Sequence, residues 1–253
     1  MRYLVLSDIH ANIVAFESVV EAAGKQSWDA VVFLGDLAGY GNAVNECVEL
    51  LSSLRPVVRL LGNHDALLLD TSPDSEPEHR RVDSIVEKVI RRHRDQLTPA
   101  SLKYIASFSD DFIGQEWQAV HGGLRRQWEY IDSLAQARLN APEMTRSICL
   151  FGHTHVPGAY AALMTSEGEM WRIVPLREGR LNYRLAPSVR AFFNPGSVGQ
   201  PRDGVPLASY GIFDTDQRRI EVHRVAYDIA SVQQSMRADG YPPALIERLA
   251  SGV

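Results

Sequence analysis

The stretch Ile148-Cys149-Leu150-Phe151-Gly152-His153-Thr154-His155 decides the fold. Its first four residues form an apolar run that predicts a short buried β-strand, and the end of this strand delivers two imidazoles separated by one residue. Two histidines in this arrangement are metal ligands that need partners from other parts of the chain. The sequence therefore predicts further ligands at the ends of other strands.

Four other apolar runs end in the same way, in polar residues that can bind a metal. Residues 3–7 precede Asp8-Ile9-His10, 31–34 precede Gly35-Asp36, 57–61 precede Gly62-Asn63-His64-Asp65, and 118–120 precede His121-Gly122-Gly123. In α/β sheets, functional groups gather outside the carboxyl ends of the strands, where loops can aim side chains at one point. Oxygen and imidazole donors without thiolates suit divalent Mn, Fe, Zn, Ni or Co. Because a carboxylate such as Asp36 can bridge two ions, the pattern predicts a two-metal site.

These blocks, taken in order, resemble the signature of the calcineurin-like metallophosphoesterase superfamily: Asp8-x-His10, Gly35-Asp36, Gly62-Asn63-His64-Asp65, His121 and Gly152-His153-x-His155. Residues 7–12, 35–41, 152–157 and 194–203 resemble the small bacterial and archaeal branch of that superfamily, so the resemblance covers most of the chain. It implies an α/β fold, a four-layer αββα sandwich in which helices flank two mixed β-sheets. It also implies a dinuclear metal site at the carboxyl ends of the strands.

The resemblance further implies a ligand set and a mechanism. One metal would be bound by Asp8, His10, Asp36 and His155, and the other by Asp36, Asn63, His121 and His153. A hydroxide activated by both ions would attack phosphorus, and His64 would protonate the departing alkoxide. We expect Asp65 to orient the imidazole of His64. The expected cofactor is a pair of divalent ions, Mn²⁺ in the first place, with Fe, Ni, Co and Zn as alternatives.

Four residues are expected to contact the substrate: Asn12, Tyr40, Arg125 and Arg202. The amide of Asn12 can lie beside the phosphate, cap the following helix, or do both. Tyr40 can stack on a base or simply pack its loop. Arg125 can clamp the phosphate or form a surface salt bridge. Asp203, next to Arg202, is a further candidate.

Composition narrows the class of protein. A chain of 253 residues with 45% hydrophobic and 23% charged residues can bury the core of one globular domain. A net charge of -5 argues against a general attraction to nucleic acid, but bound metal ions would still favour a small anionic substrate. Cys47 and Cys149 are expected to be reduced packing residues. No basic leader, cleavage site or membrane-length segment is found, so we expect a cytoplasmic protein. The sequence gives no basis for an oligomeric state.

We expect residues 1–253 to form a single domain that contains a helical insertion at about 66–115 and a helical tail at about 228–253. The insertion is expected to comprise a loop at 71–79, a charged helix at 80–94 and a helix opened by Thr98-Pro99, and to cap the site so that it restricts substrate size. His79 and His93 lie in it, and we expect both on the solvated surface because neither follows a strand.

Helices are also predicted from Asn12 to about Gly24, at about 43–54 and at 133–140. A hairpin at 160–165 and 171–174 and strands at about 181–185, 191–193, 209–214 and 219–225 are expected to make the second sheet. The turn at 194–199 is expected to support the metal ligands, and His223 is expected to be structural. The tail is expected to pack on the body of the domain.

Together these features predict a metal-dependent phosphoesterase, in the first place one that hydrolyses phosphodiesters of small or nucleotide-like substrates. Phosphomonoesterases, protein phosphatases and dinucleoside polyphosphate hydrolases share the ligand set and stay open as alternatives. The absence of a basic stripe argues against a nuclease that acts on long polymers. In a different class, the chain could be a catalytically silent, metal-stabilised interaction scaffold, but the presence of His64 and Asp65 argues against it.

Overall fold

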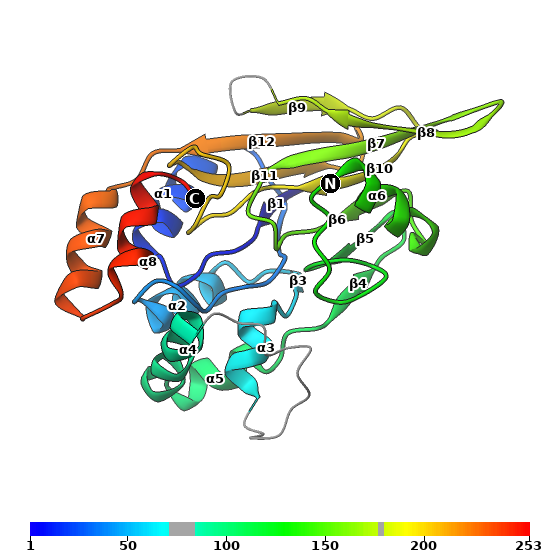
Figure 1. Ribbon diagram of the computed structural model, residues 1–253. Coiled ribbons are helices and arrows are strands. Elements are labelled where there is room, and N and C mark those ends of the chain that lie inside the picture. Colours follow the sequence, from blue (N-terminus) through cyan, green and yellow to red (C-terminus); the bar gives the residue numbers. More distant parts are fainter. Residues whose placement is uncertain (71–83, 177–179) are drawn as a thin grey trace.

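The strands form two sheets in the computed structural model, which describes residues 1–70, 84–176 and 180–253 (Figure 1). The first sheet has the order β3-β2-β1-β11-β12-β9 and the second β4-β5-β6-β10-β7-β8. The strands of the first sheet are β1 (Arg2–Leu6), β2 (Ala30–Phe33), β3 (Val58–Arg59), β9 (Leu181–Arg184), β11 (Ala208–Asp214) and β12 (Arg219–Val225). Those of the second are β4 (Asp111–Ile113), β5 (Trp117–Val120), β6 (Ile148–Leu150), β7 (Gly158–Thr165), β8 (Gly168–Val174) and β10 (Arg190–Asn194). Each sheet pairs some strands in parallel and others antiparallel.

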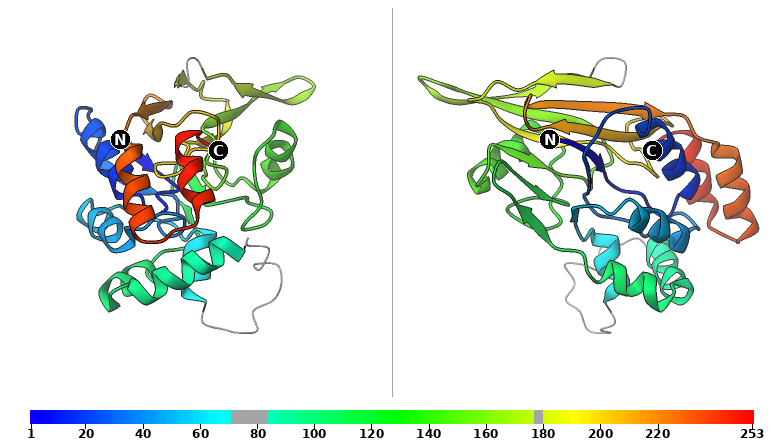
Figure 2. Two further views of the ribbon diagram at one scale, coloured as in Figure 1. Left: turned by 60° about the vertical axis from the view of Figure 1, so that its left-hand side comes forward. Right: turned by 180° about the vertical axis from the view of Figure 1, so that it is seen from behind.

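Helices cover the outer faces of the two sheets (Figures 1 and 2). They are α1 (Ile13–Ala23), α2 (Val44–Ser53), α3 (Asn63–Leu69), α4 (Ser84–Gln96), α5 (Pro99–Ile105), α6 (Leu134–Asn140), α7 (Ile229–Ala238) and α8 (Pro243–Glu247), with 3-10 turns η1 (Ala141–Glu143) and η2 (Arg248–Ala250). The caps follow from local sequence: Asn12 accepts a hydrogen bond from the N–H of Ala15, and Thr98 and Ser133 cap α5 and α6 in the same way. Within the described residues, no helix is both long and apolar enough to cross a membrane.

Three apolar layers hold the sandwich together. Val5 and Val32 of the first sheet pack against Ala119 and Leu150 of the second, which places one core between the sheets. The outer face of the first sheet packs on α1 and α2, and the outer face of the second packs on α6. The predicted four-layer αββα sandwich is therefore confirmed. Cys47 and Cys149 are buried free thiols that pack in these outer layers, as expected.

The division of strands between the sheets differs from the prediction. The strands after residue 180 do not form a second sheet of their own, because β9, β11 and β12 join β1 in the first sheet, whereas β10 pairs with β6. The local sequence indicates that a strand is buried on both faces, but it does not indicate which of the two sheets the strand joins. Of the strands that the candidate ligands follow, β1, β2 and β3 lie in the first sheet, and β5 and β6 lie in the second. The candidate metal ligands therefore come from both sheets.

The predicted insertion at 66–115 contains α4 and α5, as expected, but it ends in β4, which pairs antiparallel with β5. The structure places α3, α4 and α5 together at one end of the molecule, at the bottom of Figure 1. The predicted loop at 71–79, with His79, lies outside the described residues. That the insertion restricts substrate size stays a prediction, as does the single-domain organisation.

The tail lies beside α1 and α4 rather than apart from the body (Figure 2). Val232 and Met236 of α7 and Leu245 of α8 are buried in a cluster that also contains Val89 of α4. This packing was expected from the spacing of the apolar residues. It brings η2, at the end of the tail, next to the loop that follows β2.

Candidate metal centre

Two groups of ligand atoms converge at the carboxyl ends of the ligand-bearing strands. The first comprises Asp8, His10, Asp36 and His155, and the second comprises Asp36, His121 and His153; within each group the ligand atoms all lie within 4.8 Å of one another. The Oδ2 atom of Asp36 lies 3.6 Å from Nε2 of His10 and 3.4 Å from Nε2 of His121, so this carboxylate faces both groups. Asn63 Oδ1 lies 3.2 Å from Nε2 of His121, which adds an amide oxygen to the second group.

The backbone is unusual at these ligands. Asp8, His10, Asp36, His153 and His155 all have left-handed φ values, between 50° and 64°. Residues other than glycine rarely adopt this conformation, and it persists where the surrounding structure imposes it. Here the strands impose it through backbone hydrogen bonds, such as those from the N–H of Asp8 to the carbonyl of Gly35 and from the N–H of His10 to the carbonyl of Asp36.

Backbone carbonyls fix the orientation of the imidazoles. The Nδ1 atoms of His10, His121 and His155 lie 2.8, 2.8 and 2.6 Å from the carbonyl oxygens of Ala38, Leu34 and Gln200. A hydrogen bond from each Nδ1–H leaves the lone pair of Nε2 directed at the other ligands, which is the usual tautomer of a metal-bound histidine. His153 is reversed, because its Nε2 lies 3.2 Å from the carbonyl oxygen of Trp128.

The donor set fits a pair of divalent cations. Asp8 Oδ1 and Asp36 Oδ2 are buried and have no hydrogen-bond partner in the described structure, which is costly for carboxylates unless a cation compensates. Burial, together with the nearby Asp36 carboxylate, raises the pKa of Asp8 to about 7 in the protein alone. Although burial acts in the opposite direction, the Asp36 carboxylate raises the pKa of His121 to about 9. Protons thus compete for a site whose oxygen and nitrogen donors suit Mn, Fe, Co, Ni or Zn.

Neighbouring turns hold the ligand loops in place. A Cβ on Gly62 would lie 2.0 Å from Oδ1 of Asp36, so only glycine fits there. Ser197 Oγ donates to the carbonyl oxygen of Asp8, and Asn194 Nδ2 donates to that of Gly152, both at 2.8 Å. The turn at 194–199 therefore supports the ligand loops, as predicted.

His64 is buried beside the ligands. Its Nε2 lies 4.0 Å from Oδ2 of Asp36, and its ring centroid lies 4.9 Å from that of His10 and 4.8 Å from that of Tyr40. It is therefore close enough to serve a group bound between the two ligand sets.

The expectation that Asp65 orients His64 is wrong. The Asp65 carboxylate accepts hydrogen bonds from the backbone N–H groups of Asp36, Leu37 and Ala38 at 2.9 to 3.0 Å, and from that of Gly62 at 3.2 Å. As the third residue of α3, Asp65 faces back toward the start of its helix and the loop after β2. It positions Asp36 rather than His64.

Three residues form what we call the arginine flank: Tyr40, Arg202 and Arg248. The ring centroid of Tyr40 lies 4.6 Å from that of His10. Arg202 Nη2 donates to the Tyr40 hydroxyl at 2.9 Å, and the guanidinium carbons of Arg202 and Arg248 lie 5.6 and 5.5 Å from the centroid of the Tyr40 ring. Arg248 also donates through Nε to the carbonyl oxygen of Val253. No pattern in the sequence indicates Arg248, because this residue follows a helix and not a strand.

The expectation that His93 lies on the surface is also wrong. His93 is fully buried: its Nδ1 accepts from the N–H of Gly39 at 3.2 Å, and its Nε2–H donates to the carbonyl oxygen of Gly41 at 2.8 Å. Burial lowers the pKa of His93 to about 4. The residue therefore anchors the loop that carries Tyr40. Val89 and Ile90 lie one turn earlier on the same face of α4 and are buried. This helical spacing of apolar residues indicates in the sequence that position 93 is buried.

The other expected substrate contacts have structural partners. Asn12 caps α1 and also donates through Nδ2 to the carbonyl oxygen of Gly199 at 2.9 Å. Arg125 forms an ion pair with Glu129 at 3.6 Å, and Asp203 pairs with Arg224. Contact of Asn12 and Arg125 with a substrate stays a prediction.

The sequence model of the calcineurin-like phosphoesterase superfamily domain matches residues 1–218. The chain belongs to this superfamily. It is thus a metallophosphoesterase, a hydrolase of phosphoric esters, and the ligand clusters occupy the place that the resemblance implied. The membership also confirms the family expected from the five sequence blocks.

Two similar proteins match this chain over nearly its whole length, and a third matches part of it. The crystal structure of a metallophosphoesterase from Sphaerobacter thermophilus is 38% identical, covers 100% of this chain and 99% of its own, and superposes with a TM-score of 0.83. An uncharacterized protein of Methanocaldococcus jannaschii is 31% identical over 252 residues, which are 98% of this chain and 97% of the relative. A symmetrical bis(5'-nucleosyl)-tetraphosphatase of Xanthomonas oryzae pv. oryzae is 34% identical over 102 residues, but the match covers only 40% of this chain and 31% of that enzyme.

Proposed function

We propose that this metallophosphoesterase hydrolyses phosphodiesters of small, nucleotide-like substrates with the help of two manganese ions. The observation that carries the proposal is the convergence of seven ligand side chains, with unpaired carboxylate oxygens, beside His64. Two ionised carboxylates and two divalent ions leave the centre formally at about +2. A singly charged nucleophile and a singly charged diester neutralise this charge together, whereas a doubly charged monoester would exceed it.

Each residue of the centre has a defined task. Asp8, His10 and His155 would hold one ion, Asn63, His121 and His153 the other, and Asp36 both. When bound, such ions act as Lewis acids on the phosphoryl oxygens and lower the pKa of water. His64 would donate its proton to the departing alkoxide.

The test compares a diester with its monoester. Protein stripped with a chelator and then supplied with manganese is given bis(p-nitrophenyl) phosphate or p-nitrophenyl phosphate. Cleavage of the diester that returns only with the metal supports the proposal, and preference for the monoester contradicts it in favour of a phosphomonoesterase. No cleavage of either ester by protein that holds two metal equivalents would point to the scaffold alternative. The cytoplasmic location stays a prediction.

Hydrolysis of dinucleoside polyphosphates is a second candidate. It is favoured by the partial similarity to a bis(5'-nucleosyl)-tetraphosphatase and by the arginine flank, because guanidinium groups beside the metals can bind additional phosphates. Chromatography of the products from diadenosine tetraphosphate tests it. A kcat/KM at least about tenfold above that for the simple diester would replace the first candidate.

A further inference from the structure

A pocket of about 400 Å³ opens beside the half of the metal centre that contains His153. We call it the tyrosine pocket; its walls include Tyr130, Asp132, Thr154, Val156, Tyr160 and Ile173. We propose that this pocket binds the nucleoside of a nucleotide ester whose phosphate lies at the metal centre. The inference rests on the proposed function and names the group that the site selects.

The pocket is continuous with the ligands. The ring of Tyr130 stacks on that of His153, with centroids 4.0 Å apart and planes inclined by 15°. Thr154 lies between the ligands His153 and His155, and its Oγ1 accepts a hydrogen bond from Asn194 Nδ2 at 3.0 Å. Asn194 also lines the pocket. A group joined to a phosphate at His153 therefore reaches the pocket without a long linker.

The surface of the pocket suits a flat, partly apolar group. Tyr130, Val156 and Ile173 are 45%, 43% and 60% exposed, although large apolar side chains usually avoid water. They come from three segments and line one hollow, with Tyr160 directly across the hairpin from Ile173. Bases stack on aromatic side chains, and a volume of this size is typical of sites for small molecules. The second face of the Tyr130 ring offers such a platform.

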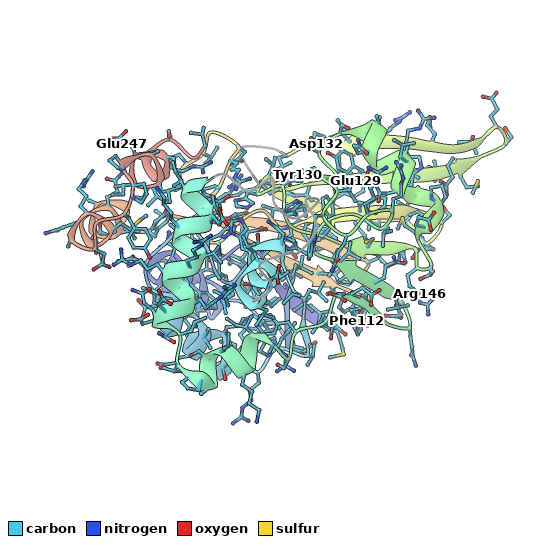
Figure 3. All side chains as sticks on the ribbon, turned by 60° about the horizontal axis from the view of Figure 1, so that its bottom comes forward. Phe112, Glu129, Tyr130, Asp132, Arg146 and Glu247 are labelled. Carbon is cyan, nitrogen blue, oxygen red and sulfur yellow. The ribbon has the colours of Figure 1, made fainter. Side chains whose placement is uncertain are left out.

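The charge of the pocket excludes a second phosphate as its occupant. Among the described residues that line it there is no lysine, arginine or histidine, and Asp132 contributes a carboxylate. Figure 3 shows Tyr130 and Asp132 close together on the segment before α6. The occupant is therefore not an anion, and Asp132 can accept a hydrogen bond from a base or a sugar hydroxyl.

The test uses two esters that share a leaving group: the p-nitrophenyl ester of thymidine 5'-phosphate and methyl p-nitrophenyl phosphate. For the manganese-loaded protein we expect kcat/KM to be about tenfold or more higher for the thymidine ester, as one stacked base would give. Ile173→Asp should bring this ratio close to one. Met164→Asp is the matched control, since Met164 is 59% exposed on the same hairpin but lies outside the pocket, and it should keep the ratio.

A binding measurement separates this proposal from the proposed function. Calorimetry should show that thymidine 5'-monophosphate binds about tenfold more tightly than inorganic phosphate, and that Ile173→Asp, but not Met164→Asp, removes the difference. Equal cleavage of the two esters by the wild-type protein would overturn the pocket and leave the diesterase intact. If neither ester is cleaved, the diesterase fails, and calorimetry decides the pocket: a thymidine preference that Ile173→Asp removes supports it, and equal binding overturns it.

Discussion

The two sides of the metal centre differ in charge and in origin. The arginine flank lies beside His10 and carries two guanidinium groups around one tyrosine. The tyrosine pocket lies beside His153 and has Asp132 as its ionised group among the described residues. Figure 3 shows Tyr130 and Asp132 well apart from Glu247, the residue that precedes Arg248 in the chain.

This difference in charge indicates how the centre would orient a substrate. The two ligand groups share the carboxylate of Asp36, and their ligands alone do not determine which way a substrate lies across the centre. Direction comes from the surroundings, because a flank of guanidinium groups favours anionic parts of a substrate and an apolar pocket favours a neutral part. Substitutions that act on both sides of the centre, or on one side alone, test whether the arginine flank and the tyrosine pocket have these separate roles.

The largest effect is expected from Asp36→Asn, which acts on both sides. Its carboxylate faces both ligand groups, so an amide should weaken both metal sites and lower kcat/KM for every ester by on the order of a thousandfold. Elemental analysis of metal content and diester kinetics measure this. Asp214→Asn is the control, since Asp214 is a buried carboxylate outside the centre. A variant that keeps two metals and its activity would contradict the bridging role.

His64→Ala comes next, and it should reduce turnover without loss of metal. Removal of a general acid typically lowers the rate by about 10² to 10⁴. The loss should be large for an alkoxide leaving group and small for p-nitrophenolate, which leaves without a proton. Parallel kinetics with the two leaving groups and a metal analysis give the answer. Equal losses for both, or a fall in metal content, would mean that His64 supports the ligands instead.

The ligands of this centre could be predicted from sequence because they follow strands. An apolar run that ends in Asp8-Ile9-His10 or in His153-Thr154-His155 predicts both a buried β-strand and metal binding at its end. The clusters in the structure contain the expected carboxylates and imidazoles, and they come together at the expected ends of the strands. Neither the sheet to which each strand belongs nor the left-handed backbone at the ligands could be predicted, because both depend on pairing between distant segments.

The surroundings were harder to predict for the same reason. Arg248 and His93 approach the centre from helices, so no strand precedes them in sequence. The sequence pairs Asp65 with its neighbour His64, but the Asp65 side chain, at the start of a helix, faces the preceding loop. Its partners there are backbone N–H groups. The side chains of residues adjacent in sequence point in different directions on a helix. Proximity along the chain therefore does not predict that two such side chains are in contact.

Arg202→Gln should have a moderate effect, and only through the arginine flank. Loss of one charged hydrogen-bond donor near a phosphate costs about 1.5–3 kcal/mol, or roughly ten- to a hundredfold in kcat/KM. Arg248→Gln should cost less, because Arg202 adjoins a ligand through its backbone hydrogen bond to His155, whereas the contact found for Arg248 in the flank is with Tyr40. We expect neither change to alter the preference for thymidine over methyl esters, because that preference comes from the tyrosine pocket. A change in this ratio would show that the two sides are not independent.

The smallest effect is expected from His93→Gln, measured as thermal stability at two pH values. His93 ties α4 to the loop of Tyr40, and its pKa of about 4 in the folded protein lies below the value of about 6.5 usual for histidine. Between these values the unfolded chain binds a proton that the folded protein does not, so stability falls as the pH drops from about 6.5 toward 4. Above about pH 6.5 both states are neutral and this contribution vanishes.

Comparison of His93→Gln with the wild-type protein isolates the contribution of His93 to the pH dependence of stability, because both proteins contain the other buried histidines. His93→Gln should lower Tm at pH 7.5, because the glutamine cannot fill both hydrogen bonds to Gly39 and Gly41 in the same geometry. Its further loss of Tm between pH 7.5 and pH 5 should be smaller than that of the wild-type protein. If His93→Gln lost as much Tm between pH 7.5 and pH 5 as the wild-type protein, protonation of His93 would not be what destabilises the folded protein in acid.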